Sequence, residues 1–179
     1  MQNISIFSAI KLIQIYPNMA KYLIIPIISN LICISYLGYN AYLDIRTKEI
    51  PVKNSIIVAF IGVALSIVAV VCSGYFGMRL LFSVLMNTAI SLIPGIILFL
   101  VSKYTNQMIG YGDTMVIVVL GLYLDVKNLM GLIVLAFFIA GLVALYEFII
   151  RKKDKKHEIP FVPFLFISYV IINCTQFIH

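Results

Sequence analysis

Long uninterrupted runs of apolar residues, separated by short polar segments, dominate the pattern along this chain. Each run has about 20 residues, the length that a helix rising 1.5 Å per residue needs to cross a hydrocarbon layer about 30 Å thick. Because these runs are continuous and do not alternate with polar residues, they exclude a strand-built membrane barrel. The pattern predicts an all-α, polytopic transmembrane helix bundle of about six spans, near residues 22–43, 55–73, 80–101, 113–124, 129–150 and 159–178.

Two parts of the pattern depart from full-length spans. Residues 3–16 carry polar side chains at helical spacing, which predicts an amphipathic interfacial helix within residues 1–20. The bundle at 22–178 follows it, and we expect both to form one membrane-embedded domain, residues 1–179. The fourth span has about 12 residues and reaches only about 18 Å as a helix, so it starts below the headgroups, tilts little, or borders a wet cavity.

Composition supports a lipid environment. The chain is 63% hydrophobic and 11% charged, whereas roughly a quarter of a soluble domain is charged. The net charge of +6 comes from basic residues beside membrane-length segments, so we expect no nucleic acid as partner. Cys33, Cys72 and Cys174 lie singly, and His157 and His179 have no further ligands at metal-binding spacing, so we expect no metal and no cofactor.

The basic residues are unevenly distributed between the predicted connections. If the first, third and fifth connections lie in the cytoplasm, nine of the 13 Lys and Arg residues lie inside, and those outside are Lys11, Lys21, Arg79 and Lys127. The positive-inside rule therefore predicts a multi-pass protein of the cell (inner) membrane with both termini outside. This orientation puts Asp44, at the end of the first span, and Asp113, at the start of the fourth, on the same cytoplasmic surface.

Only seven acidic residues exist, so each acid beside an apolar segment can be weighed separately. Taken alone, Asp44 is typical of an interfacial acid that offsets Arg46 and Lys48, and Asp113 is typical of a helix N-cap. Brought together from different helices, two carboxylates cannot both ionise cheaply, so the pair shares a proton and one member is base while the other is acid. Such a pair can activate a water to attack a peptide carbonyl and can protonate the leaving amine.

The neighbouring residues sharpen this hypothesis. Gly110 and Gly112, just before the second acid, let backbone approach closely, and a substrate strand could lie against that surface. Asp125 borders the same fourth span at its outer end, which excludes it from the pair. Glu147 stands four residues before Arg151, a spacing that predicts an ordinary ion pair on one helical face.

Three motifs, in this order, resemble those of type IV prepilin peptidases. Residues 44–51 (DIRTKEIP), followed by Asn54, resemble the first aspartate motif of that family. Residues 110–113 (GYGD) resemble its glycine-aspartate motif, which presenilin-like intramembrane proteases share, and residues 159–165 (IPFVPFL) resemble the segment that opens its final span. The three together favour catalysis over the N-cap and loop-charge interpretations.

The resemblance implies an aspartyl endopeptidase whose catalytic residues are Asp44 and Asp113. It implies cleavage, at the cytoplasmic face, of the leader peptide of type IV prepilins or pilin-like secretion subunits, just before the hydrophobic pilin helix. The expected partners are that membrane-anchored substrate and the lipid bilayer. The residues that we expect to bind or position substrate are Gly110, Gly112, Arg46, Lys48, Glu49, Pro51 and Pro163.

Charge suggests how the first loop would act. Arg46, Lys48 or Lys53 would attract an acidic residue of the pilin, while Glu49 would meet the basic leader. The chain also departs from the family, because Met115 stands where many relatives have lysine. It has neither the paired cysteines nor the N-terminal cytoplasmic insertion of the longer members that methylate their product, so we expect no methyltransferase activity.

Two alternatives stay open at the level of sequence. A non-catalytic transporter could use the two acids for proton or cation coupling, which explains acids in helices but not the glycine motif. A presenilin-like protease would keep the chemistry and act within the bilayer on membrane helices, but the Asp-Arg and Ile-Pro pattern argues against it.

Overall fold

The computed structural model describes residues 20–72, 78–105, 110–149 and 160–178. Helices account for most of these ranges, which contain no strand, so the predicted all-α class is confirmed. The predicted interfacial helix lies almost wholly outside the described residues. The helices are α2 (Ala20–Thr47), α3 (Val52–Cys72), α4 (Met78–Tyr104), α5 (Tyr111–Leu120), α6 (Val126–Ile149) and α7 (Val162–Ile178).

Helix length separates two classes within this bundle. Helices α2, α3, α4 and α6 are long and apolar enough to cross a membrane. Helix α7 has 17 residues and α5 has 10, so at 1.5 Å per residue α5 is only about 15 Å long. The short fourth span is therefore a real feature of the fold, and the whole has the character of a multi-pass membrane protein.

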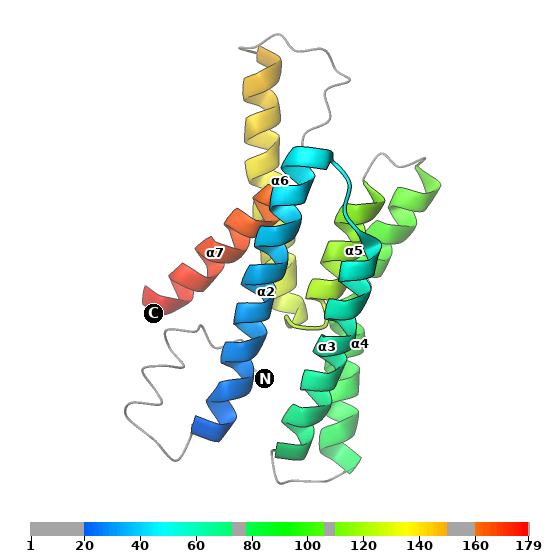
Figure 1. Ribbon diagram of the computed structural model, residues 1–179, viewed down its shortest axis with the longest axis vertical. Helices are drawn as coiled ribbons and strands as arrows, with labels where there is room; N and C mark the ends of the chain where they lie inside the picture. Colours follow the sequence, from blue (N-terminus) through cyan, green and yellow to red (C-terminus); the bar gives the residue numbers. More distant parts are fainter. Residues whose placement is uncertain (1–19, 73–77, 106–109, 150–159, 179) are drawn as a thin grey trace.

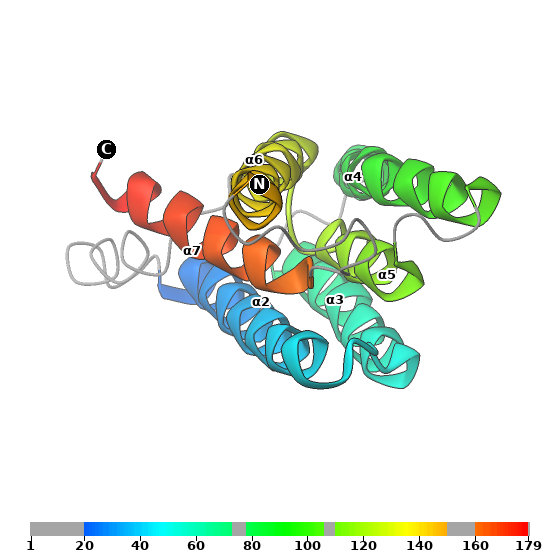
Figure 2. The ribbon, with the colours of Figure 1, turned by 90° about the horizontal axis from the view of Figure 1, so that it is seen from above.

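The long helices run along the long axis of the molecule, and α7 crosses α2 obliquely (Figure 1). Seen from above, α5 lies between α3 and α4, while α7 lies between α2 and α6 (Figure 2). The hydrophobic core joins α2, α5, α6 and α7. Helix α5 is thus enclosed by neighbouring helices on several sides.

Enclosure explains how so short a helix belongs to a membrane bundle. Five of its 10 residues are buried, from Thr114 to Leu120, so protein surrounds much of α5 where a spanning helix would meet lipid. Gly95 of α4 allows the close approach, since a Cβ there would stand 2.8 Å from the Cα of Val118. Small residues at helix contacts are a common device for close packing in membranes.

Tyrosine hydroxyls tie the helices together across the bundle. Tyr36 of α2 bonds Ser55 of α3 at 2.7 Å, and Tyr169 of α7 donates to Asn30 of α2 at 2.5 Å. Tyr123, in the turn after α5, donates to the carbonyl oxygen of Val58 at 2.6 Å. Such bonds stabilise membrane bundles by about 1 kcal/mol each.

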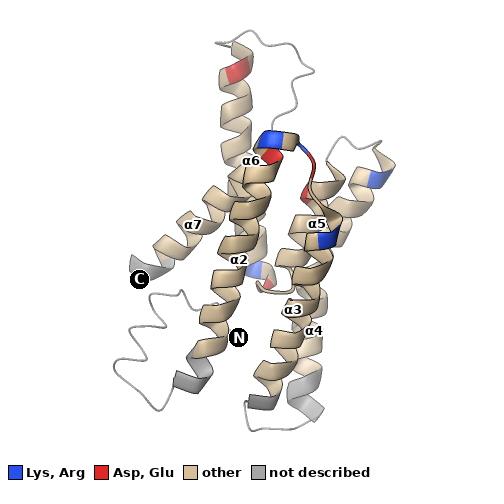
Figure 3. Cartoon of the chain, in the orientation of Figure 1, with Lys and Arg blue, Asp and Glu red and all other residues tan. Residues whose placement is uncertain are grey.

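Charged residues of the described part of the chain gather where α2 ends, α3 begins and α5 begins (Figure 3). The basic residue in the last turn of α2 is Arg46, and that in the last turn of α4 is Lys103. A second, smaller charged group lies where α6 begins. The end of α2 and the starts of α3, α5 and α7 therefore lie toward the same end of the bundle.

Candidate active site

Asp44 lies in the last turn of α2 and is 6% exposed. Its Oδ2 accepts a hydrogen bond of 3.0 Å from the backbone N–H of Val162, the first residue of α7, and the N–H of Phe161 also donates to the carboxyl group. The first N–H groups of a helix have no partner within the helix and attract negative charge. The first and third sequence motifs therefore meet at this carboxylate, which is not the solvated loop acid that its neighbours suggest.

Asp113 is the third residue of α5 and is partly buried. The N-cap of that helix is Gly110, and no side chain makes a capping hydrogen bond there. A Cβ on Gly110 would stand 3.0 Å from the Oδ2 of Asp113, so the carboxyl group folds back over the glycine. The N-cap interpretation of Asp113 is therefore wrong, and its carboxyl group remains available for other contacts.

Gly112, in the second sequence motif, packs against Ile50, in the first. A Cβ at this position would stand 2.7 Å from the Cβ of Ile50, a separation that real side chains do not tolerate. Ile50 therefore packs directly on the backbone of α5 beside Asp113, and only glycine permits the contact. The segment after α2 is held against the start of α5 by this packing.

These contacts bring Asp44 and Asp113 close enough for their charges to interact. Each acid comes from a different helix, α2 or α5, and Lys48 also interacts electrostatically with Asp44. A pair of carboxyl groups in a partly buried position can share one proton and hold a water for attack on a carbonyl. Asp44 and Asp113 are therefore the candidates for such a pair.

The charged residues that follow Asp44 in the first motif are exposed at the end of α2 and just after it. Arg46 is exposed, and its guanidinium lies 5.0 Å from the centre of the Tyr42 ring. Lys48 and Glu49 are exposed as well, and Lys48 has a positive φ of 54°. The N–H of Lys48 donates to the carbonyl oxygen of Asp44 at 3.1 Å, so this residue ends α2 with a left-handed cap.

Two prolines mark the starts of neighbouring helices. Pro51 immediately precedes α3 and accepts a backbone hydrogen bond from Asn54, while Pro163 lies in the first turn of α7. Proline suits these positions because the first N–H groups of a helix need no partner within it. Both prolines are partly buried and help to form the helix starts beside the acids. Their role in positioning substrate stays a prediction.

Two further acids, Asp125 and Glu147, lie apart from the pair. Asp125 is at the opposite end of α5 from Asp113 and accepts a 2.7 Å hydrogen bond from Asn128 in the first turn of α6. Glu147 is in the last turn of α6, and its predicted partner Arg151 lies outside the described residues. His157 and His179 lie outside them too. Within the described part of the chain no three metal-ligating side chains come together.

Two buried polar residues beside the pair escaped sequence reasoning. Asn40, one turn before Asp44 on α2, is fully buried; its Nδ2 donates to the carbonyl oxygen of Tyr36, and its Oδ1 has no hydrogen-bond partner. Thr114 follows Asp113, is fully buried, and donates to the carbonyl oxygen of Tyr111. The spacing of four between Asn40 and Asp44, within an apolar run, was the signal that could have found the first.

Comparison with known proteins adds one match. A family model described as the type IV leader peptidase family matches residues 31–145, which is more than half of the 179 residues. The matched segment includes both acids and the glycine motif. No curated protein and no solved structure gives a significant match.

Proposed function

Because the chain belongs to the type IV leader peptidase family, we propose that it is a membrane aspartyl endopeptidase that removes the leader peptide of type IV prepilins or pilin-like secretion subunits. The observation that carries the proposal is the approach of Asp44 and Asp113 from different helices, close enough for their charges to interact. Family membership makes the protein a peptidase. The aspartic mechanism is supported by this pair, since α2 and α5 bring two acids close enough for their charges to interact.

The hydrogen bonds suggest a division of labour within the pair. Backbone N–H groups at the start of α7 point at the Asp44 carboxylate, and donors of this kind favour the ionised form. We therefore assign Asp44 as the base that takes a proton from the attacking water, and Asp113 as the acid that protonates the carbonyl oxygen. As the C–N bond breaks, the leaving amine takes the proton held by Asp44, and a hydroxyl group of the tetrahedral intermediate returns a proton to Asp113, which leaves the carboxylic acid product and restores the pair.

The gathering of charge supports an orientation for this chemistry. Basic residues near the ends of α2 and α4 lie at the same end as the acid pair, and basic residues flank the cytoplasmic ends of spanning helices. The proposed site thus faces the cytoplasm from the inner membrane. A leader peptide rich in basic residues would meet the exposed Glu49 there, and Arg46 or Lys48 would meet an acidic residue of the pilin.

The transporter alternative loses its support. It explained why acids lie in helices, but the family match includes both acids and supports a peptidase. No observation in the described residues favours ion coupling over hydrolysis.

Co-expression with a candidate prepilin tests the proposal. We expect Asp44→Asn and Asp113→Asn each to abolish leader removal, measured as the mobility shift of the pilin on a gel. Asp125→Asn is the matched control, because it removes an acid at the other end of α5 and should leave processing intact. Processing that persists in either pair variant, with membrane levels equal to wild type, would refute the proposed chemistry.

A further inference from the structure

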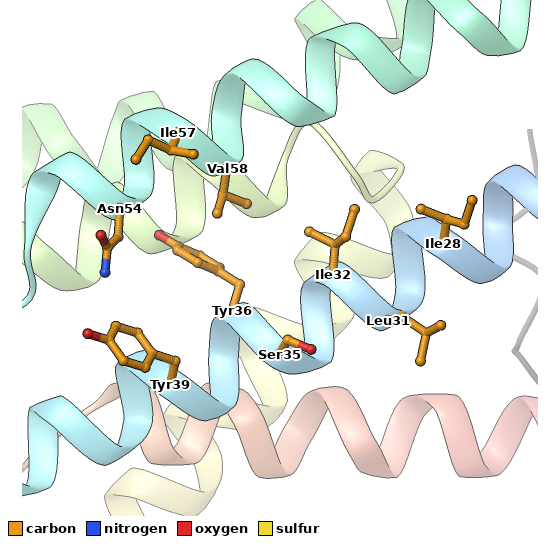
Figure 4. Close-up of a pocket in the computed structure, with 9 residues that line it drawn as sticks. All are labelled: Ile28, Leu31, Ile32, Ser35, Tyr36, Tyr39, Asn54, Ile57 and Val58. Carbon is orange, nitrogen blue, oxygen red and sulfur yellow. The ribbon is translucent and has the colours of Figure 1, made fainter.

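A groove of about 480 Å³ runs between α2 and α3 (Figure 4). It is lined on α2 by side chains from Ile28 to Tyr39, and on α3 by Asn54, Ile57 and Val58. All of these residues lie in helices that are long and apolar enough to cross a membrane. The groove is therefore at membrane depth.

The groove is open toward its surroundings along its length. Leu31 on one wall is 52% exposed and Ile57 on the other is 57% exposed, so their apolar surfaces would face lipid or a partner. Tyr36 lines the groove and connects its two walls, because its hydroxyl group is hydrogen-bonded to Ser55 of α3. An apolar segment could enter sideways from the bilayer without unpacking the two helices.

The two ends of the groove differ in polarity. Tyr39 and Asn54 lie together at one end, and Ile28 and Leu31 lie at the other (Figure 4). Ile28 and Tyr39 are 11 residues apart on α2, so the groove is about 16 Å long. Tyr39 and Asn54 thus make one end polar and Ile28 and Leu31 make the other apolar, while Ser35 and Tyr36 add hydroxyl groups between the two ends.

The polar end is the end beside the candidate active site. Tyr39 stands five residues before Asp44 on α2, and Asn54 stands in the first turn of α3. The segment between these helices holds Ile50 against Gly112 next to Asp113. A chain leaving the acid pair would therefore meet the polar end first and the apolar end last.

We infer that this groove binds the hydrophobic helix of the membrane-anchored substrate, with the start of that helix at Tyr39 and Asn54 and its body along Ile57, Leu31 and Ile28. The inference rests on the proposed function, because it supposes that the scissile bond lies just before such a helix.

The chemistry of the groove matches this occupant. The first four N–H groups of a helix lack partners within the helix, and the hydroxyl of Tyr39 and the amide oxygen of Asn54 can accept hydrogen bonds from them at low dielectric. A helix with side chains is 10–12 Å across, so a 16 Å length occupies about 1,300 Å³ or more. The groove of about 480 Å³ therefore binds one face of the helix and leaves the other to lipid.

Site-specific photo-crosslinking tests this directly. Asp113→Asn protein in lipid nanodiscs would carry a photoreactive amino acid at Leu31, at Tyr39, or at the control position Val134, an α6 residue that is 67% exposed. We expect crosslinks to an uncleaved prepilin from the first two positions and not from the third. Tyr39 should capture residues just after the scissile bond, and Leu31 should capture residues about eight positions further on, since the two lie eight residues apart on α2. Equal capture at Leu31 and Val134, or lipid as the only adduct, would overturn the inference.

A second readout separates failure of the groove from failure of the proposed function. Leu31→Trp should lower the ratio of kcat/KM for the anchored prepilin to kcat/KM for a soluble peptide spanning the cleavage site by about tenfold, the size of one lost apolar contact. Val134→Trp should keep the wild-type ratio. An unchanged ratio in Leu31→Trp would refute the groove alone, whereas wild-type protein that cleaves neither substrate would refute the peptidase proposal itself.

Discussion

Asp44 is an acid in a helix that is apolar enough to cross a membrane, yet it is only 6% exposed. An ionised carboxylate at the centre of a membrane helix costs about 2.5–3.5 kcal/mol in insertion experiments. Two features reduce that cost here, the position in the last turn of α2 and the N–H of Val162 that bonds its Oδ2. The hydrogen bond between Asp44 and Val162 thus connects α2 to α7 across 118 positions of sequence.

Gly112 offers a test at the residue scale. We expect Gly112→Ala to displace Ile50, because the new Cβ would stand 2.7 Å from the Cβ of that residue. Overpacking of this kind costs about 1–3 kcal/mol and should also reduce prepilin processing. Thermal unfolding of the purified protein in detergent measures the first effect, and a processing assay measures the second.

Gly131 is the matched control for that substitution. No atom lies within 4 Å of a Cβ built at Gly131, which is within α6. Gly131→Ala should therefore leave processing intact and raise stability by about 0.4–1 kcal/mol through reduced freedom of the unfolded chain. If both alanine variants behave alike, the packing of Ile50 on Gly112 does not matter.

At the scale of elements, the boundaries of α2 and α5 decide where the acids lie. Lys48 ends α2 in a left-handed conformation at φ 54°, which costs an ordinary residue about 1–2 kcal/mol. Gly110 and the contact of Gly112 with Ile50 fix the start of α5. The loop after α2 is thereby set by backbone conformation as well as by packing.

A pair of variants separates the conformation of Lys48 from its charge. Lys48→Val and Lys48→Gly both remove the ammonium group, but a β-branched residue is a severe outlier at positive φ whereas glycine adopts it freely. The valine variant should unfold with a free energy about 1–2 kcal/mol lower than that of the glycine variant. Denaturant titration in detergent measures this difference, and equal stabilities would argue against the left-handed cap.

Tyr123 provides a test of how the turn after α5 is held. Its hydroxyl donates to the carbonyl oxygen of Val58 at 2.6 Å, so Tyr123→Phe should lower stability by about 1 kcal/mol. Tyr104 is 82% exposed at the end of α4, which makes Tyr104→Phe the control that should change nothing. A drop in stability of the same size in both variants would show that the interhelical bond is not the cause.

Much of the element scale could be predicted from the sequence. Apolar runs placed the six described helices within a few residues of their observed ends, and the shortness of the fourth span followed from its length of about 12 residues. The reason that α5 can be short was not predictable, because the contact of Gly95 with Val118 depends on how α4 and α5 pack. For the same reason the packing of Ile50 on Gly112 had no clear sequence signal, whereas the spacing of four between Asn40 and Asp44 in an apolar run did point to Asn40.

At the scale of the whole molecule, an acid pair that faces the cytoplasm fixes the orientation of every helix in the membrane. The ends of α2 and α4 and the start of α5 should face the cytoplasm, and the start of α6 should face the other side. Single cysteines at Lys103 and at Lys127, in a background without Cys33, Cys72 and Cys174, report this through labelling by a membrane-impermeant maleimide. We expect Lys103→Cys to react only from the cytoplasmic side and Lys127→Cys only from the outer side. The opposite labelling would place the acid pair on the outer face and contradict the orientation.

Asp44 and Asp113 are proposed to act as one catalytic unit, which a double-mutant cycle on purified protein in nanodiscs can examine. A positioned acid or base contributes about 10²–10⁴-fold to the rate, and residues that act together lose activity without additivity. We predict that Asp44→Asn, Asp113→Asn and the double variant all lower kcat for prepilin cleavage by at least about 10²-fold and to nearly the same level. Losses that multiply in the double variant, or substantial cleavage by either single variant, would contradict the account.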